Sequence, residues 1–189
     1  MKMMDLACIE FYNTPEGDVM VKPVNGAVYV LKETNRDVIQ SMLQLIDDRY
    51  PEAFKALSKL YSSNSMNRVN YEYLMVHRFC RCNFGEYDSS KLDVDYVGVF
   101  NPEQVKCPLR NSVDCRYCGV ICSPVLNTNL SDRETQILEL ISKGMTNQQI
   151  ADELSISIFT VIRHRNNMRA KLQVSNTAEL VSYYKNMVK

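Results

Sequence analysis

The chain has 189 residues, of which 46% are hydrophobic, and its 22 basic and 22 acidic residues leave no net charge. This composition predicts a folded protein of one large or two small domains and excludes wholesale disorder. No apolar run approaches the roughly 20 residues that cross a bilayer, and the N-terminus lacks the apolar stretch of a secretory signal. We therefore expect a cytoplasmic protein without a membrane segment, whose cysteines form no structural disulfides.

Residues 1–125 are predicted to form a small, mainly helical domain. An apolar run at 26–31 follows an Asn-Gly turn signal and can form a strand. Further along, apolar residues recur every three or four positions in three segments, which predicts helices. These segments are residues 36–50, 51–61 and 70–81. Residues 62–67 are predicted to be a loop, and residues 94–100 are a second candidate strand.

Six of the seven cysteines lie between positions 80 and 122. Pro108, Gly119 and Pro124 bend the chain around them, and small closed thiolate sites require such bends. Four thiolates around a tetrahedral zinc ion are the chemistry that this pattern favours. The expected metal ligands are Cys82, Cys107, Cys115 and Cys122, with Cys118 as the alternate. The domain would then be a sensor or partner-docking domain organised by metal.

Other uses of these cysteines stay open. An iron–sulfur cluster also takes four thiolates, and His77 on the preceding helix is a further candidate ligand. Free cysteines otherwise behave as small buried apolar residues, which is what we expect of Cys8. A thiol-based enzyme or redox carrier is not favoured, because a nucleophilic cysteine needs a base nearby and the chain has only two histidines. We expect no enzymatic activity.

Residues 126–189 are predicted to form a four-helix domain that contains a helix-turn-helix. Capping boxes of the form Ser/Thr-x-x-Glu/Gln at 131–134 and 146–149 begin the first two helices. Gly144 lies where the chain leaves the first of them in a left-handed conformation. Ser157 caps the third helix, and the last helix is predicted at 176–187.

The third predicted helix, residues 158–172, has an apolar stripe opposite a basic side that also carries an amide. It has four basic residues and no acidic one. Such a helix fits the major groove of duplex DNA, where arginine pairs with guanine and asparagine with adenine. Groove contacts are expected from Ile162, Arg163, Asn166 and Arg169, phosphate contacts from Thr160, Arg165 and Lys171, and a further DNA contact from Asn147. An ordinary three-helix bundle with a solvated basic helix has the same periodicity.

Three motifs separate these alternatives. They are Leu-Ser-x-Arg-Glu at 130–134, Gly-x-Thr-Asn-x-x-Ile-Ala at 144–151, and Ser-x-x-Thr-Val-x-x-His-x-x-x-Met-x-x-Lys-Leu at 157–172. With them, residues 129–185 resemble the LuxR/FixJ-type DNA-binding domain. The resemblance implies a sequence-specific transcriptional regulator that binds duplex DNA as a homodimer through its last helix. RNA polymerase or another regulator is a candidate partner. Ile162 stands where the family usually has lysine, so a different operator is expected.

The cysteine-rich segment carries a weaker resemblance. His-Arg-Phe-x-Arg-Cys-Asn-Phe-Gly at 77–85, followed by Cys107, Cys115 and Cys122, resembles N-terminal regions of LuxR-type regulators from Bacteroidetes. Those regions usually have the form Cys-Pro-x-Arg-Gly-x-Cys and then Cys-x-Pro. This chain has a longer insert at 111–114, and Cys118 is additional. The resemblance implies no function for the domain.

Other regulator architectures fit less well. Residues 1–125 show neither the alternation of strands and helices nor the acidic site of a receiver domain, and the chain has no tryptophan, which the autoinducer-binding type has around its pocket. A sigma-like or sigma-associated promoter-binding protein shares the helix-turn-helix and stays an alternative. No segment suited to binding a −10 element is visible upstream, which counts against it.

Overall fold

The computed structural model describes Leu6 and residues 9–87, 92–94, 100–103, 105–110 and 115–187. The chain divides into two compact units, Met1–Leu126 and Asn127–Lys189. Each unit has its own cluster of buried apolar side chains, so each is described by itself. Among the residues described, no helix combines the length and the apolar character needed to cross a membrane.

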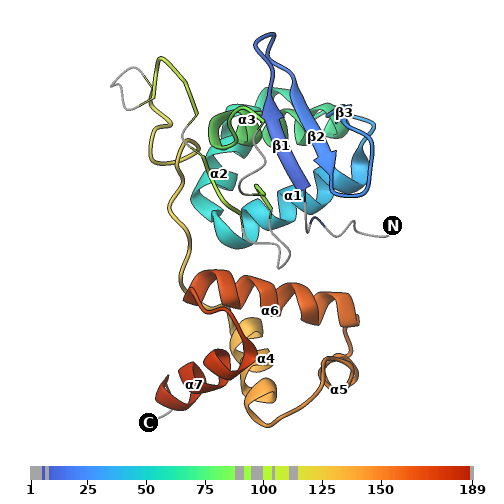
Figure 1. The fold of residues 1–189 in the computed structure, drawn as a ribbon, viewed down its shortest axis with the longest axis vertical. Helices are drawn as coiled ribbons and strands as arrows, with labels where there is room; N and C mark the ends of the chain where they lie inside the picture. The colour runs from blue at the N-terminus through green and yellow to red at the C-terminus, as the bar shows by residue number, and fades with distance from the viewer. Residues whose placement is uncertain are drawn as a thin grey trace. The chain divides into compact units, whose positions relative to one another are not determined.

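The N-terminal unit begins with a three-stranded antiparallel sheet in the order β1-β2-β3 (Figure 1). The strands are β1 (Ile9–Asn13), β2 (Val19–Pro23) and β3 (Tyr29–Val30). Phe11 of β1 lies opposite Val21 of β2, and both side chains are buried. The expectation of a helical domain was therefore incomplete, because the sequence analysis missed β1 and β2. The strand expected at 26–31 is reduced to the two residues that pair with β2.

Three helices complete the N-terminal unit and confirm the helical periodicity. They are α1 (Arg36–Arg49), α2 (Pro51–Leu60) and α3 (Arg68–Asn83). Pro51 begins α2, where its fixed φ suits the first helical turn. Asn67 caps α3, because its side chain accepts a hydrogen bond from the backbone N–H of Asn70. A single 3₁₀ turn, η1 (Ser62–Asn64), lies in the loop between α2 and α3. α3 packs against β1 and β2, and α1 packs against α2 and α3.

Aromatic rings at the centre of this unit join segments that are far apart in the sequence. Phe84, directly after α3, stacks on Phe11 of β1 with ring centroids 5.4 Å apart. Phe100 lies 5.9 Å from Phe84 and also contacts Tyr50 and Phe79. The candidate strand at 94–100 is represented by isolated bridges of Val94 to Ile9 and to Phe100, and its residues 95–99 lie outside the described part.

The C-terminal unit consists of the four expected helices. They are α4 (Asp132–Ser142), α5 (Asn147–Glu153), α6 (Ile158–Leu172) and α7 (Thr177–Met187). Both predicted capping boxes are present, at Ser131 with Glu134 and at Thr146 with Gln149. The left-handed conformation expected at Gly144 is also found, with φ of 80°. Buried apolar side chains from all four helices, Leu180 of α7 among them, form one core.

Candidate nucleic-acid interface

A tight turn between α5 and α6 sets the direction of α6. Ser155 adopts φ of 52°, and the backbone N–H of Ile156 donates to the carbonyl of Ala151 over 2.9 Å. The Ser157 side chain then accepts from the N–H of Thr160 and so caps α6. Val161 and Met168 are fully buried in the core of the unit, and they fix the back of the helix. These contacts hold α6 as the second helix of a helix-turn-helix.

The opposite side of α6 is the candidate DNA-binding surface, which we call the α6 front. It comprises Phe159, Ile162, Arg163, Asn166 and Arg169. α6 has no acidic side chain along its length, so nothing on the helix itself repels a phosphate backbone. Ile162 is 38% exposed, and Arg163 and Asn166 are partly exposed. The structure thus brings the predicted groove residues onto one helix side, although whether they touch bases stays a prediction.

The sequence analysis did not single out Phe159 on this surface. Its phenyl ring is 72% exposed, near the start of α6 and one helical turn before Ile162. A phenylalanine at that position does not belong to the core. Its place outside the apolar stripe of the helix was the feature of the sequence that could have indicated a surface role. Phe159 and Ile162 give the α6 front an apolar edge beside its basic residues.

Lys171, for which a phosphate contact is predicted, lies inside the unit. Lys171 is only 5% exposed, and its ammonium group lies 2.8 Å from the carboxylate of Glu134, which is 2% exposed. Lys171 stands nine residues after Ile162 in α6, which at 3.6 residues per turn is half a turn away from the α6 front. The ammonium group of Lys171 therefore pairs with Glu134 inside the unit and is not exposed at its surface.

Two other predicted contacts lie close to α7. The guanidinium of Arg165 donates to the hydroxyl of Thr177 over 2.7 Å, and that of Arg169 approaches the same hydroxyl at 3.5 Å. Burial, and secondarily the charge of Arg169, lower the pKa of Arg165. Both residues thereby help to join α6 to the start of α7. Thr160 lies in the first turn of α6, and Asn147 is at the first position of α5. The DNA contacts expected of Arg165, Arg169, Thr160 and Asn147 stay predictions.

Asn176 and Glu179 hold the start of α7. The Asn176 side chain accepts from the N–H of Glu179 over 3.0 Å, and Glu179 accepts in return from the N–H of Ser175 over 2.8 Å. These hydrogen bonds, that of the Ser175 backbone first, lower the pKa of Glu179. Leu180 faces the core, while Tyr183 and Met187 are 40% and 48% exposed, one turn apart on α7. These two side chains form an exposed apolar strip on the side of α7 that faces away from the core.

The cysteines of the N-terminal unit belong to two environments. Cys80 is fully buried in the core, and burial raises the pKa of its thiol well above the usual value. Cys82 at the end of α3 lies nearer the later cysteines, of which Cys107 is exposed and Cys115 and Cys118 are partly exposed. The ring of His77 packs at a tilt against that of Tyr73, with centroids 5.4 Å apart, and its imidazole is hydrogen-bonded to the backbone of Gly17. These contacts explain the position of His77 by packing within the unit. Cys8 lies outside the described residues.

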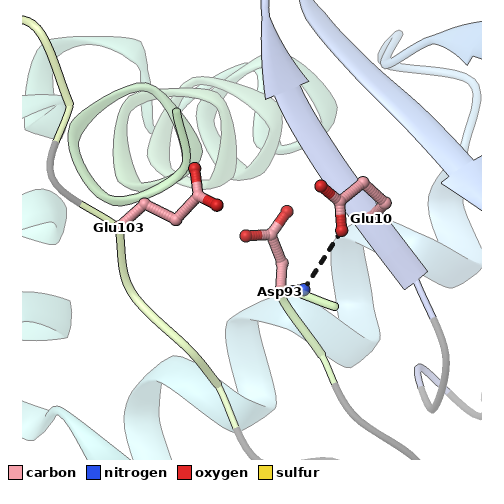
Figure 2. Close-up of side chains that lie close together, drawn as sticks. All are labelled: Glu10, Asp93 and Glu103. Carbon is pink, nitrogen blue, oxygen red and sulfur yellow. Dashed lines mark hydrogen bonds between the residues drawn. The ribbon is translucent and has the colours of Figure 1, made fainter. Parts of the chain in front are cut away.

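A group of three carboxylates, which the sequence analysis missed, lies elsewhere in this unit (Figure 2). Within the described part, oxygens of Glu10, Asp93 and Glu103 lie within 4.8 Å of one another. Each carboxylate accepts a backbone N–H: Asp93 from Phe11 over 2.6 Å, Glu103 from Gly85 over 2.7 Å, and Glu10 from Asp93 over 3.3 Å. These bonds fasten Asp93 and Glu103 to β1 and to the turn after α3.

Comparison with known proteins identifies the C-terminal unit. Residues 128–184 match the family described as "Bacterial regulatory proteins, luxR family". The chain is 37% identical over 75 residues to the Fimbriae Z protein of Escherichia coli (strain K12), which covers 40% of this chain and 35% of that protein. It is 44% identical over 54 residues to the Oxygen regulatory protein NreC of Staphylococcus carnosus (strain TM300), covering 29% of this chain and 25% of that protein.

The matched part of the chain thus spans only a quarter to about a third of the length of these curated relatives. Residues 128–184 are a LuxR-family helix-turn-helix DNA-binding domain, the kind found in transcriptional regulators. The family match leaves the preceding residues unassigned.

Proposed function

We propose that this chain is a sequence-specific transcriptional regulator that binds duplex DNA as a homodimer, with α6 in the major groove. The observation that carries the proposal is the α6 front. It presents a guanidinium, a carboxamide and apolar groups on one side of a helix whose opposite side is buried. Those groups match the donors, acceptors and thymine methyls that the major groove displays.

The side chains suggest a division of roles on the DNA. Arg163 is suited to the two acceptors of guanine, and Asn166 to the donor and acceptor of adenine. Phe159 and Ile162 are suited to thymine methyl groups, which a lysine at position 162 would not favour. Thr160, near the capped N-terminus of α6, is suited to a phosphate, which fixes the helix in place without reading sequence.

Replacing Arg163 or Asn166 with alanine is expected to lower specific affinity by about 1–3 kcal/mol each and to relax base preference at one position of the operator. The loss follows because a base edge would be left without its hydrogen-bond partner. The operator is first selected from random duplexes with the full-length protein. Fluorescence anisotropy then compares each variant on the selected site and on single-base variants of it.

Lys55→Ala is the matched control, because it removes one positive charge from an exposed position of α2 in the other unit. It should leave base preference unchanged. If Arg163→Ala and Lys55→Ala behaved alike on the selected operator and its variants, the groove assignment of α6 would be wrong.

The homodimer has its own expected result. Binding should protect two half-sites one helical turn apart, about 10 base pairs centre to centre, and the complex should contain two chains per duplex. Because Tyr183 and Met187 form the exposed apolar strip of α7, Tyr183→Glu should weaken binding to the full operator more than binding to an isolated half-site. Footprinting and mass measurement of the complex check this, and a single chain protecting one half-site would contradict it.

A further inference from the structure

The segment that carries the later cysteines has little regular structure to hold it. In its described part, residues 105–126 contain no helix or strand, only turns and one isolated bridge between Cys118 and Cys122. The carbonyl of Tyr117 accepts the N–H groups of Val120, Ile121 and Cys122 within 3.1 Å. Gly119 adopts φ of 77°. The chain around Tyr117 is therefore a tightly wound turn, and Cys122 leaves it at a fixed point.

Asn83 fastens this turn to the end of α3. Its amide group donates to the carbonyl of Ile121 over 2.8 Å, and its side-chain oxygen accepts from the N–H of Ser123 over 3.0 Å. Asn83 is fully buried, as is Ile121. Because Asn83 follows Cys82 directly, these two bonds hold Cys122 beside the helix end that carries Cys82.

Hydrogen bonds bring Cys107 and Cys115 toward Cys122. The Arg110 guanidinium donates to the hydroxyl of Ser123, directly after Cys122, over 2.7 Å, and the backbone N–H of Arg110 donates to the carbonyl of Cys107 over 3.0 Å. The N–H of Cys118 donates to the carbonyl of Cys115 over 3.0 Å, and the backbone of Cys118 pairs with that of Cys122. Cys107 and Cys115 therefore each lie within one turn of a residue that is bonded at or beside Cys122.

We propose that Cys82, Cys107, Cys115 and Cys122 bind a single zinc ion that closes the segment between Cys107 and Cys122 onto the end of α3. Four thiolates in a tetrahedron form a closed structural site, which supplies folding energy to a segment whose described part contains no helix or strand. Such a site carries a net negative charge. Arg110, which is bonded beside Cys122, and Arg78, which stands four residues before Cys82 in α3, are placed to balance it.

The sulfurs must move to reach the metal. Zn–S bonds of about 2.3 Å put tetrahedral sulfurs about 3.8 Å apart. Among the residues described, no three cysteine sulfurs all lie within 4.8 Å of one another. The anchored pair, Cys82 and Cys122, would stay in place, while the exposed Cys107 and the partly exposed Cys115 rotate inward. Metal binding would thus fix Cys107 and Cys115 beside the anchored pair, as expected where ligation and folding are coupled.

Cys118 is the internal alternative. Its backbone pairs with that of Cys122, and it is partly exposed. Cys118 is the cysteine of this segment that the proposed ligand set leaves out, so Cys118→Ser is the matched control for the ligand variants.

Metal analysis of the full chain tests the proposal. Protein purified without added metal should contain one zinc per chain, and Cys118→Ser should keep it. Cys107→Ser and Cys115→Ser should each lose most of it, and since neither residue belongs to the buried core, circular dichroism should show their helices intact. Cobalt exchanged into the wild-type protein should give the absorption of tetrahedral thiolate coordination.

Three results would overturn the proposal. Protein that holds no metal and takes up no cobalt would make the cysteines packing residues. Iron with labile sulfide in place of zinc would make the site an iron–sulfur cluster. Loss of zinc from Cys118→Ser, with retention by Cys115→Ser, would exclude this ligand set. None of these results bears on DNA binding by α6, which is tested separately.

Discussion

Lys171→Ala is expected to lower the free energy of unfolding of the C-terminal unit by about 3–5 kcal/mol, the range for removing one partner of a buried ion pair. The ammonium group of Lys171 and the carboxylate of Glu134 lie 2.8 Å apart, with side-chain exposures of 4% and 2%. Alanine would leave the carboxylate buried without its cation. The free-energy cost of leaving that charge buried and unpaired is larger than the net stabilisation that the intact ion pair provides. Removing Lys171 alone should therefore destabilise the unit by more than the pair stabilises it.

The same carboxylate also holds the start of α4. Glu134 accepts from the backbone N–H of Ser131 over 2.8 Å and from its hydroxyl over 3.0 Å. The ion pair and the capping box therefore share one side chain, and loss of Lys171 should loosen the first turn of α4 together with the end of α6. This coupling makes amide exchange in both helices the informative measurement.

Hydrogen exchange of the full-length protein, followed by mass spectrometry, should show faster exchange in α4 and α6 of Lys171→Ala and unchanged exchange in α1 to α3. Lys185→Ala is the control, because it removes the same charge from an exposed position of α7. Glu134→Gln combined with Lys171→Met should recover most of the protection, since it removes both charges and keeps an oxygen for the Ser131 N–H. Native exchange in Lys171→Ala with weaker binding to every DNA sequence would instead restore the phosphate role.

The C-terminal unit was largely predictable because its signals are local. Ser131 and Thr146 each stand three residues before their capping partner, and Gly144 marks a helix end, so neighbouring residues alone set the helix boundaries. The phosphate contact predicted for Lys171 took account of its positive charge and not of its angular position on α6. Its partner Glu134 is 37 residues away, and no local pattern connects the two.

The N-terminal sheet was missed for a different reason. Alternation of apolar and polar residues is present in β1, but Glu10 between Ile9 and Phe11 is itself buried. It receives the N–H of Asp93, 83 residues away. Because this distant contact also buries the polar side of β1, the strand does not separate a solvent face from a core face. The predicted helices, by contrast, needed only their own periodicity.

The cysteine pattern predicted that the later cysteines gather at one site, but it did not indicate which residue positions them. Asn83 appears in the sequence as an ordinary polar residue at a helix end. Its role depends on Ile121 and Ser123, which are 38 and 40 residues away. The residue that positions the cysteine segment was therefore visible only in three dimensions.

Asn83→Ala is expected to destabilise the N-terminal unit by about 1–3 kcal/mol, the cost of leaving one buried polar group, the carbonyl of Ile121, without its partner. The carbonyl of Ile121 and the N–H of Ser123 lose their partner, and the carbonyl of Phe79, to which the Asn83 amide donates over 3.0 Å, loses one bond. Because the turn is then no longer held to α3, the amide hydrogen of Ser123 should exchange faster than in the wild-type protein. Amide exchange in α6 should stay unchanged.

Two variants separate the hydrogen bonds from general damage to the fold. Asn83→Asp keeps an acceptor for the Ser123 N–H but loses both donated bonds, so it should free the Ile121 side of the turn more than the Ser123 side. Asn70→Ala removes an amide that donates to Glu33 over 2.7 Å in a partly buried contact, and it should leave the turn protected. If Asn83→Ala exchanged at Ser123 as slowly as wild type, the buried packing of Ile121 alone would hold the turn, and Cys122 would stay beside Cys82 without the asparagine.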